Sequence, residues 1–223
     1  MKLLLLGVWL AAAVVAASCA ADDPVGDAAD AAVGVRATGC GLVDRLGTGA
    51  LVDGGDRDLI VTSAHTVAGA ASITVERHTR RSEVELLAID PERDIAVLST
   101  PGWTEPGRRL DTTPSRGEAA RLAVWNPDES MSVSETTITR LLRVTIEDIY
   151  VEGEYERRAF ELDATVIPGN SGGPVVADDG SVLGIVYARS RARGGVAFAV
   201  SAVEVADVIA DAGTDPAEPG RCA

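Results

Sequence analysis

Short runs of β-branched and other apolar residues recur along this chain, with clusters of Gly, Pro and Asp between them. Clear examples occupy residues 72–75, 84–89, 120–124 and 144–151. Many short strand-like runs, without helical patterns alternating between them, favour an all-β sandwich or barrel over βαβ units. With 223 residues, of which 46% are apolar, the chain can form one domain, or one domain made of two barrels.

A glycine-rich turn at residues 168–174 (PGNSGGP) places one serine between two apolar runs. Glycines on both sides of Ser171 let the backbone adopt positive φ and let the carbonyl group of a bound molecule approach closely. In such a turn the amides of Gly169 and Ser171 can converge on one point, as an oxyanion hole requires. A serine alone is a poor nucleophile, so this interpretation needs a base and an orienting acid elsewhere in the chain.

Both partners are present upstream. His65 ends an apolar run at residues 59–64, and Asp94 follows a turn and opens another short apolar run. The order His, Asp, Ser is one of the known arrangements of a catalytic triad: the serine attacks, the histidine transfers its proton and the aspartate holds the imidazole tautomer. The α/β-hydrolases share the G-x-S-x-G pattern but place their histidine after the serine. Since His65 and His78 both precede Ser171, that fold is excluded.

Three segments, 62–65 (TSAH), 94–98 (DIAVL) and 169–174 (GNSGGP), resemble the trypsin-like serine peptidases, specifically their compact bacterial HtrA-like branch. The resemblance covers residues 34–223. Three further short segments resemble the MarP-like periplasmic proteases of actinobacteria; they are residues 39–41, 148–150 and 222–223. MarP-like proteins carry several membrane-spanning helices before the protease domain, and this sequence shows none.

The resemblance implies a fold of two perpendicular six-stranded β-barrels with a C-terminal helix. It divides the chain into a first barrel, a second barrel and the helix, at residues of about 34–108, 115–200 and 201–212. His65 and Asp94 would then come from the first barrel and Ser171 from the second. Residues 101–114, rich in Pro, Gly and Arg, are the expected connection between the barrels.

The expected helix begins with a capping-box pattern at residues 201–204, in which Ser201 caps the amide of Glu204 and Glu204 reaches back to Ser201. Helical spacing predicts one apolar face, and Gly213 is a suitable stop. The residues expected on that face are Val203, Ala206 and either Ile209 or Ala210.

Residues 1–18 have the features of a signal peptide: a lysine at position 2, then an apolar run of about 15 residues, shorter than the roughly 20 needed to span a membrane. Two processing outcomes are open. Residues 16–19 (AASC) resemble a lipoprotein cleavage site, which would make Cys19 the lipidated first residue of a membrane-anchored protein. Ordinary cleavage after Ala20 would release a secreted protein. Residues 19–33 contain several aspartates without apolar periodicity, so we expect an acidic tether there.

Three cysteines are an awkward number for an exported protein unless one has another use. If Cys19 carries lipid, Cys40 and Cys222 remain to pair in an oxidising compartment. MarP-like proteases similarly tie the two ends of their protease domain together. The alternative is two free thiols.

Composition limits the partners. A formal net charge of −14 argues against binding to nucleic acid or to an anionic membrane surface. With two histidines and no paired cysteine motif, we expect no catalytic metal and no cofactor. A local basic cluster is either a solvated loop or a contact for acidic residues of a substrate; its members are Arg189, Arg191 and Arg193.

The resemblance also assigns a substrate pocket. Trypsin-type enzymes that cut after Arg or Lys carry an aspartate six residues before the serine, where this chain has Thr165. The other walls would come from Val186, Ala188 and Ala197. Without a carboxylate to neutralise a cation, the pocket predicts cleavage after small or medium apolar residues. Asn170 replaces the aspartate that pairs with a freed N-terminus in zymogen-type members, so activation by that route is not expected.

These features together predict an exported serine endopeptidase that acts on protein or peptide substrates in the cell envelope. About ten residues follow the expected helix, too few for a PDZ domain, which favours selective processing over HtrA-type degradation of unfolded proteins. The competing function is an anchored pseudoprotease that binds peptides or wall components without cutting them. The sequence carries no signal for an oligomeric state.

Overall fold

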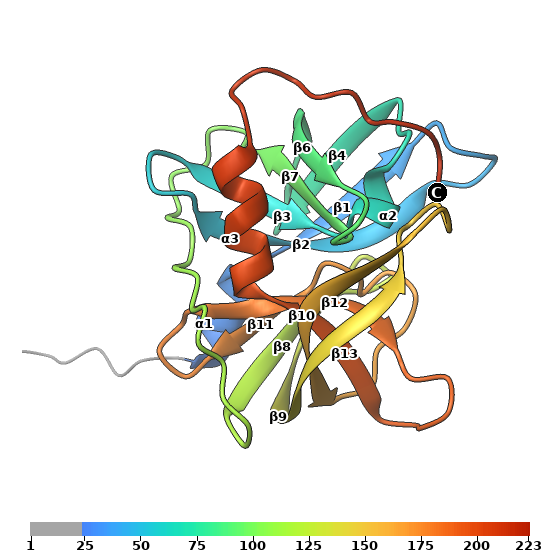
Figure 1. The fold of residues 1–223 in the computed structure, drawn as a ribbon. Coiled ribbons are helices and arrows are strands. Elements are labelled where there is room, and N and C mark those ends of the chain that lie inside the picture. Colours follow the sequence, from blue (N-terminus) through green and yellow to red (C-terminus); the bar gives the residue numbers. More distant parts are fainter. Residues whose placement is uncertain (1–23) are drawn as a thin grey trace, which may run out of the picture.

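The computed structural model describes residues 24–223, which form two β-structures, one above the other in Figure 1. The first is an antiparallel sheet of seven strands in the order β5-β4-β1-β2-β3-β7-β6. Its strands in chain order are β1 (Ala32–Thr38), β2 (Arg45–Asp53), β3 (Asp58–Thr62), β4 (Ser72–Arg77), β5 (Arg80–Val84), β6 (Leu86–Asp90) and β7 (Ile95–Ser99).

The second β-structure is a closed antiparallel barrel of six strands in the order β10-β13-β12-β11-β8-β9. Its strands are β8 (Ala119–Trp125), β9 (Met131–Glu147), β10 (Glu154–Asp163), β11 (Pro174–Ala177), β12 (Val182–Arg189) and β13 (Val196–Ser201). Three helices accompany the strands in the described region: α1 (Pro24–Asp30), α2 (Ala64–Val67) and α3 (Ala202–Asp211).

Three apolar clusters explain why the two β-structures pack together. One fills the first sheet, one fills the barrel, and a third lies between them and α1 and α3. Central strands of the first sheet therefore bury both faces: on β3, Ile60 faces the sheet's own cluster and Val61 faces the shared one. Such strands read as nearly continuous apolar runs because neither face meets water.

The fold class expected from the sequence is confirmed, with one difference in detail. The barrel that contains β8–β13 has six strands, whereas the first half has seven strands in an ordered sheet. Residues 101–114 lie between β7 and β8, where the connection was expected. They are tied to both halves, because the Asp53 amide donates to the Arg108 carbonyl (2.9 Å) and the Val182 amide donates to the Arg109 carbonyl (2.8 Å).

The N-terminal part of the fold begins earlier than expected. Residues 24–33 were assigned to an acidic tether, but they form α1 and the start of β1, and Ala28, Ala31 and Val33 are fully buried. Small alanines allow this segment to lie close against the shared core despite its acidic composition. The predicted signal peptide and Cys19 lie outside the described residues. Among residues 24–223, no helix is long and apolar enough to cross a membrane.

Helix α3 lies across both β-structures (Figure 1), in contact with β6 and β7 on one side and with β10, β12 and β13 on the other. The expected capping box and apolar face were wrong. Ser201 occupies the N-cap position without a side-chain capping bond, and the buried face carries Ala202, Glu204, Val205 and Val208. The tertiary contacts of Glu204 replace the local cap: its carboxylate accepts from Arg93 Nε (2.9 Å) and from the Arg158 amide (3.0 Å).

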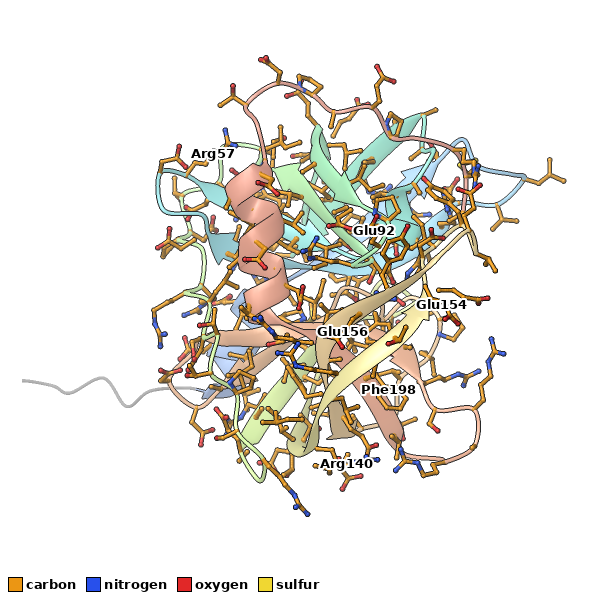
Figure 2. All side chains as sticks on the ribbon, viewed as in Figure 1. Arg57, Glu92, Arg140, Glu154, Glu156 and Phe198 are labelled. Atoms are coloured by element: carbon orange, nitrogen blue, oxygen red, sulfur yellow. A yellow bond between two sulfur atoms is a disulfide. The ribbon has the colours of Figure 1, made fainter. Side chains whose placement is uncertain are left out.

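The last turn of α3 contains no basic residue to balance the partial negative charge of a helix C-terminus. Arg57, in the β2–β3 loop beside the end of α3 (Figure 2), supplies this charge by donating from Nη2 to the Gly213 carbonyl (2.6 Å). The helix is thus anchored to the first sheet at its end as well as along its buried face.

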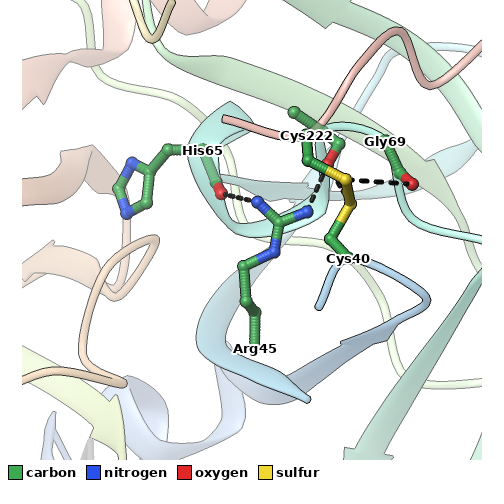
Figure 3. The surroundings of a disulfide bond; sticks show 6 residues. Cys40, Arg45, His65, Gly69 and Cys222 are labelled. Carbon is green, nitrogen blue, oxygen red and sulfur yellow. Dashed lines mark hydrogen bonds between the residues drawn. A yellow bond between two sulfur atoms is a disulfide. The ribbon is translucent and has the colours of Figure 1, made fainter. Parts of the chain in front are cut away.

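After α3 the chain returns over the first sheet to a disulfide between Cys40 and Cys222 (Figure 3). The Ala217 amide donates to the Leu86 carbonyl (2.7 Å), and the Gly69 amide donates to the Pro219 carbonyl (2.6 Å). Gly69 has φ +69°, and a Cβ there would lie 2.4 Å from the Cys222 nitrogen, so only glycine permits this approach. The disulfide therefore fastens the C-terminal segment beside the helical turn α2.

Reducing this disulfide should lower the free energy of unfolding by about 5 kcal/mol, because the bond closes a loop of 182 residues in the unfolded chain. Urea unfolding with and without reductant measures the difference. The double variant Cys40→Ser/Cys222→Ser is the control and should not respond to reductant. Equal unfolding midpoints for oxidised and reduced wild type would contradict the prediction.

Candidate active site

His65 lies in α2, the single helical turn that follows β3. Arg45 of β2 holds this turn in place: its guanidinium donates to the His65 carbonyl (2.8 Å) and to the Ala68 carbonyl (Figure 3). Ser63, at the start of the turn, reaches across to the barrel and donates to the Val186 carbonyl (3.4 Å). The backbone that carries the imidazole is therefore held by both β-structures.

Asp94 ends the turn between β6 and β7 with φ +57°, a left-handed conformation that aspartate tolerates better than most residues. Its carboxylate accepts from the His65 amide (2.9 Å) and from His65 Nδ1 (2.8 Å). The Asp94 side chain is 7% exposed and the His65 side chain 37%. Because Nδ1 donates to Asp94, Nε2 is the ring nitrogen left to act as a base.

The pKa of His65 is raised above its ordinary value of 6.5. Burial lowers this pKa, but the hydrogen bond and the negative charge of Asp94 together outweigh burial. The positive charges of Arg45 and Arg157 oppose Asp94 and limit the rise. The imidazolium form is thus stabilised by a buried carboxylate, as proton transfer from a serine hydroxyl requires.

The turn that carries Ser171 comes from the barrel but is bonded to the first sheet. The Thr48 amide donates to the Ser171 carbonyl (2.7 Å), and the Gly172 amide donates to the Val186 carbonyl (2.7 Å). Gly172 has φ +88°, and a Cβ there would lie 1.9 Å from the Thr48 carbonyl oxygen, so the close approach excludes any other residue. No hydrogen bond joins Ser171 Oγ to His65 among residues 24–223. Such bonds often tighten only when substrate binds.

Thr48 is a functional residue that sequence reasoning missed. It is fully buried on β2, and its hydroxyl donates to the Gly169 carbonyl (3.1 Å) and accepts from the Trp125 amide (2.9 Å). With the backbone bond to Ser171, Thr48 holds the carbonyls on both sides of Asn170. The available signal was a polar residue inside an otherwise apolar strand, since a buried hydroxyl needs hydrogen-bond partners.

The amides of Gly169 and Ser171 donate to no protein acceptor within the described part of the chain. Neither amide is therefore used in a hydrogen bond within the described residues. Asn170 between them is buried and fully occupied: its Oδ1 accepts from the Ile167 amide (2.9 Å), and its Nδ2 donates to the Trp125 carbonyl (3.1 Å). A neutral side chain thus holds the loop without an ion pair to a chain terminus.

A depression of about 170 Å³ opens beside Ser171. Of the residues predicted to form the pocket walls, Val186 and Ala188 line this depression and two others do not. Thr165 is exposed outside the depression, and Ala197 is fully buried in the barrel core. The remaining lining comes from Val166, Ile167, Pro168, Tyr187 and Arg189. The lining contains no carboxylate.

The basic cluster near this depression divides into unlike members. Arg193 pairs with Glu161 of β10, with Nη2 at 2.5 Å from the carboxylate. Arg189 is exposed at the end of β12 and lines the depression, and its guanidinium forms no ion pair in the described region. The same region holds no group of three His, Cys, Asp or Glu that could bind a metal ion.

The rate at which a fluorophosphonate modifies Ser171 should rise with pH through a midpoint above 6.5, because only neutral His65 accepts the serine proton and Asp94 raises its pKa. Asp94→Asn should move this midpoint to lower pH and slow the reaction by about 10⁴-fold, since the hydrogen bond that orients the tautomer is lost. Labelling kinetics across mildly acidic to alkaline pH measure both effects. A midpoint that is the same in both proteins would contradict this assignment.

Comparison with known proteins agrees with this geometry. The model of the trypsin-like peptidase domain matches residues 47–185. Serine protease Rv3671c (MarP) of Mycobacterium tuberculosis is 30% identical over 168 residues, covering 74% of this chain and 42% of the relative. A probable periplasmic serine endoprotease, DegP-like, of Halomonas elongata is 31% identical over 180 residues, covering 76% and 36%.

The crystal structure of the Rv3671c protease in its active form superimposes with a TM-score of 0.83 and 27% identity, covering 90% of this chain and 88% of that one. The chain spans less than half the length of the two curated relatives. The family match covers more than half of this chain, and the fold and the MarP-like resemblance noted in the sequence agree with it. The chain therefore belongs to the trypsin-like peptidase family.

Proposed function

We propose that this protein is an exported serine endopeptidase in which Ser171 is the nucleophile, His65 the general base and acid, and Asp94 the orienting carboxylate. The observation that carries the proposal is the buried Asp94 carboxylate on His65 Nδ1 at 2.8 Å, in a fold where a glycine turn holds Ser171 against the same sheet. The similarity to serine proteases supports the same chemistry.

In the proposed reaction, Ser171 Oγ forms a bond to the substrate carbonyl carbon while its proton moves to His65 Nε2. The amides of Gly169 and Ser171 donate to the oxygen that becomes negative. His65 then gives the proton to the leaving amine as the C–N bond breaks. Water repeats the sequence on the acyl-serine: its proton passes to His65 and returns to Ser171 Oγ, which releases the carboxylic acid product.

The proposed substrates are proteins or peptides of the cell envelope. The signal-peptide features of residues 1–18 support export, and one of the curated relatives is described as periplasmic. A lipid on Cys19 would anchor the protein to the membrane.

Cell fractionation tests the anchor, because Cys19→Ser should move the protein from the membrane to the soluble fraction.

Active-site labelling tests the proposed chemistry. A fluorophosphonate should label the wild type and not Ser171→Ala, whereas Ser115→Ala, which changes an exposed serine outside the site, should label normally. If the probe labels both the folded, oxidised wild type and Ser171→Ala, another residue carries the reaction. No labelling of that wild type would favour the competing function, a binding protein that does not cut.

The site also predicts cleavage after small or medium apolar residues, because the depression is small and apolar walls such as Val166 and Val186 line it without a carboxylate. A library of peptides that differ at the residue before the cleaved bond measures this preference. A profile dominated by Arg or Lys would overturn it.

A further inference from the structure

Arg157 of β10 is a buried cation that the proposed mechanism does not use. It is 2% exposed, and no carboxylate pairs with it among residues 24–223. Its guanidinium donates to the Arg93 carbonyl (2.7 Å) and to the Glu147 carbonyl (3.4 Å), while Nε has no partner in the described region. A buried charge without a counter-ion is costly, so its presence points to a role other than packing.

The contacts of Arg157 lead to the orienting acid. The Arg93 carbonyl belongs to the peptide bond that enters Asp94, the residue held at φ +57°. Left-handed conformations of this kind persist when the surrounding structure fixes them from several sides. Because Arg157 belongs to the barrel and Asp94 to the first sheet, this hydrogen bond helps to set the position of the acid relative to the serine.

Other groups from outside the first sheet hold the same turn. The Ile149 amide, just after β9, donates to the Pro91 carbonyl (3.2 Å). The Arg93 side chain donates from Nε to Glu204 of α3 (2.9 Å), while its Nη1 donates within the same turn to Asp90 at the end of β6 (2.6 Å). The β9–β10 hairpin and α3 therefore hold the β6–β7 turn from the side of the barrel.

Arg157 also contacts a residue that lines the depression beside Ser171. Its guanidinium lies 5.0 Å from the centre of the Tyr187 ring, within the range of a cation–π contact, and Tyr187 lines the depression beside Ser171. One buried side chain thus contacts both the turn that ends in Asp94 and a wall of the site.

We propose that Arg157 is a positioning residue for the acid of the triad: from the barrel it holds the peptide that leads into Asp94 and joins that turn to the Tyr187 wall. This inference rests on the proposed function of Ser171, His65 and Asp94.

The effect on His65 separates positioning from the effect of charge alone. The charged groups that act on His65 are Asp94 from the β6–β7 turn, Arg45 from β2 and Arg157 from β10. If Arg157 acted only through its charge, its removal would raise the pKa of His65. If it positions Asp94, its removal weakens the stronger Asp94 interaction and lowers that pKa.

The experiment compares Arg157→Met, which keeps the apolar stem, with Arg157→Lys, which keeps the charge but not the planar fork that bonds two carbonyls. Arg158→Met is the matched control, because the Arg158 side chain is exposed on the same strand and forms no ion pair in the described region. Fluorophosphonate labelling rates against pH, peptide kcat and KM, and thermal melting are measured for each protein.

We expect Arg157→Met to slow labelling by about tenfold or more, to lower kcat more than it raises KM, and to move the labelling midpoint to lower pH. Arg157→Lys should recover part of the rate, and Arg158→Met should match the wild type. If Arg157→Met does not fold, Arg157→Lys is used for the test. Its midpoint of labelling rate against pH should also move to lower pH, by a smaller amount.

Three outcomes would overturn the proposal: an unchanged labelling rate, a midpoint that moves to higher pH, or a loss of rate that only follows a loss of folded protein with the midpoint unmoved. Failure of the proposed function itself looks different, because then wild type and Ser171→Ala would behave alike.

Discussion

The contact between β2 and the serine turn is the constraint on which the rest of the site depends. His65 and Asp94 lie in segments that connect strands of the first sheet and Ser171 in a turn between strands of the barrel, so no single β-structure contains the site. Thr48 joins the two halves by donating from its amide to the Ser171 carbonyl and from its hydroxyl to the Gly169 carbonyl. A small shift between the halves would change the reach from serine to histidine, and these bonds oppose such a shift in a region that excludes water.

Two arginines hold the backbone that carries His65 and Asp94. Arg45 donates to the carbonyl of His65, Arg157 donates to the carbonyl before Asp94, and the Asp94 carboxylate accepts from His65 Nδ1. The cations act on the backbone rather than on the carboxylate, so Asp94 keeps its oxygens for His65. The disulfide between Cys40 and Cys222 adds a covalent restraint next to the turn of His65 (Figure 3).

The site residues predicted from the sequence rest on two kinds of signal, local motifs and the family resemblance. His65, Asp94 and Ser171 follow buried strands or tight turns, and Asp94 and His65 meet as the motif implies. Thr165 was assigned to the pocket by its distance from Ser171, but the loop between β10 and β11 turns Val166 inward instead. Ala197 faces the barrel interior because β13 pairs with both β10 and β12, and a strand directs alternate side chains to opposite faces.

The sequence by itself determined the all-β class, the strand-length runs and the chemistry of the glycine turn, because strand period and turn conformation depend on residues close together in the chain. The tertiary structure decided what depends on distant segments. Glu204 is a partner of Arg93 instead of a helix cap, residues 24–33 belong to the core, and Thr48 and Arg157 donate from separate strands to the carbonyls of Gly169 and Arg93. These contacts join residues up to 121 positions apart, and hydrogen bonds across such separations follow from how the two β-structures pack, which no local pattern encodes.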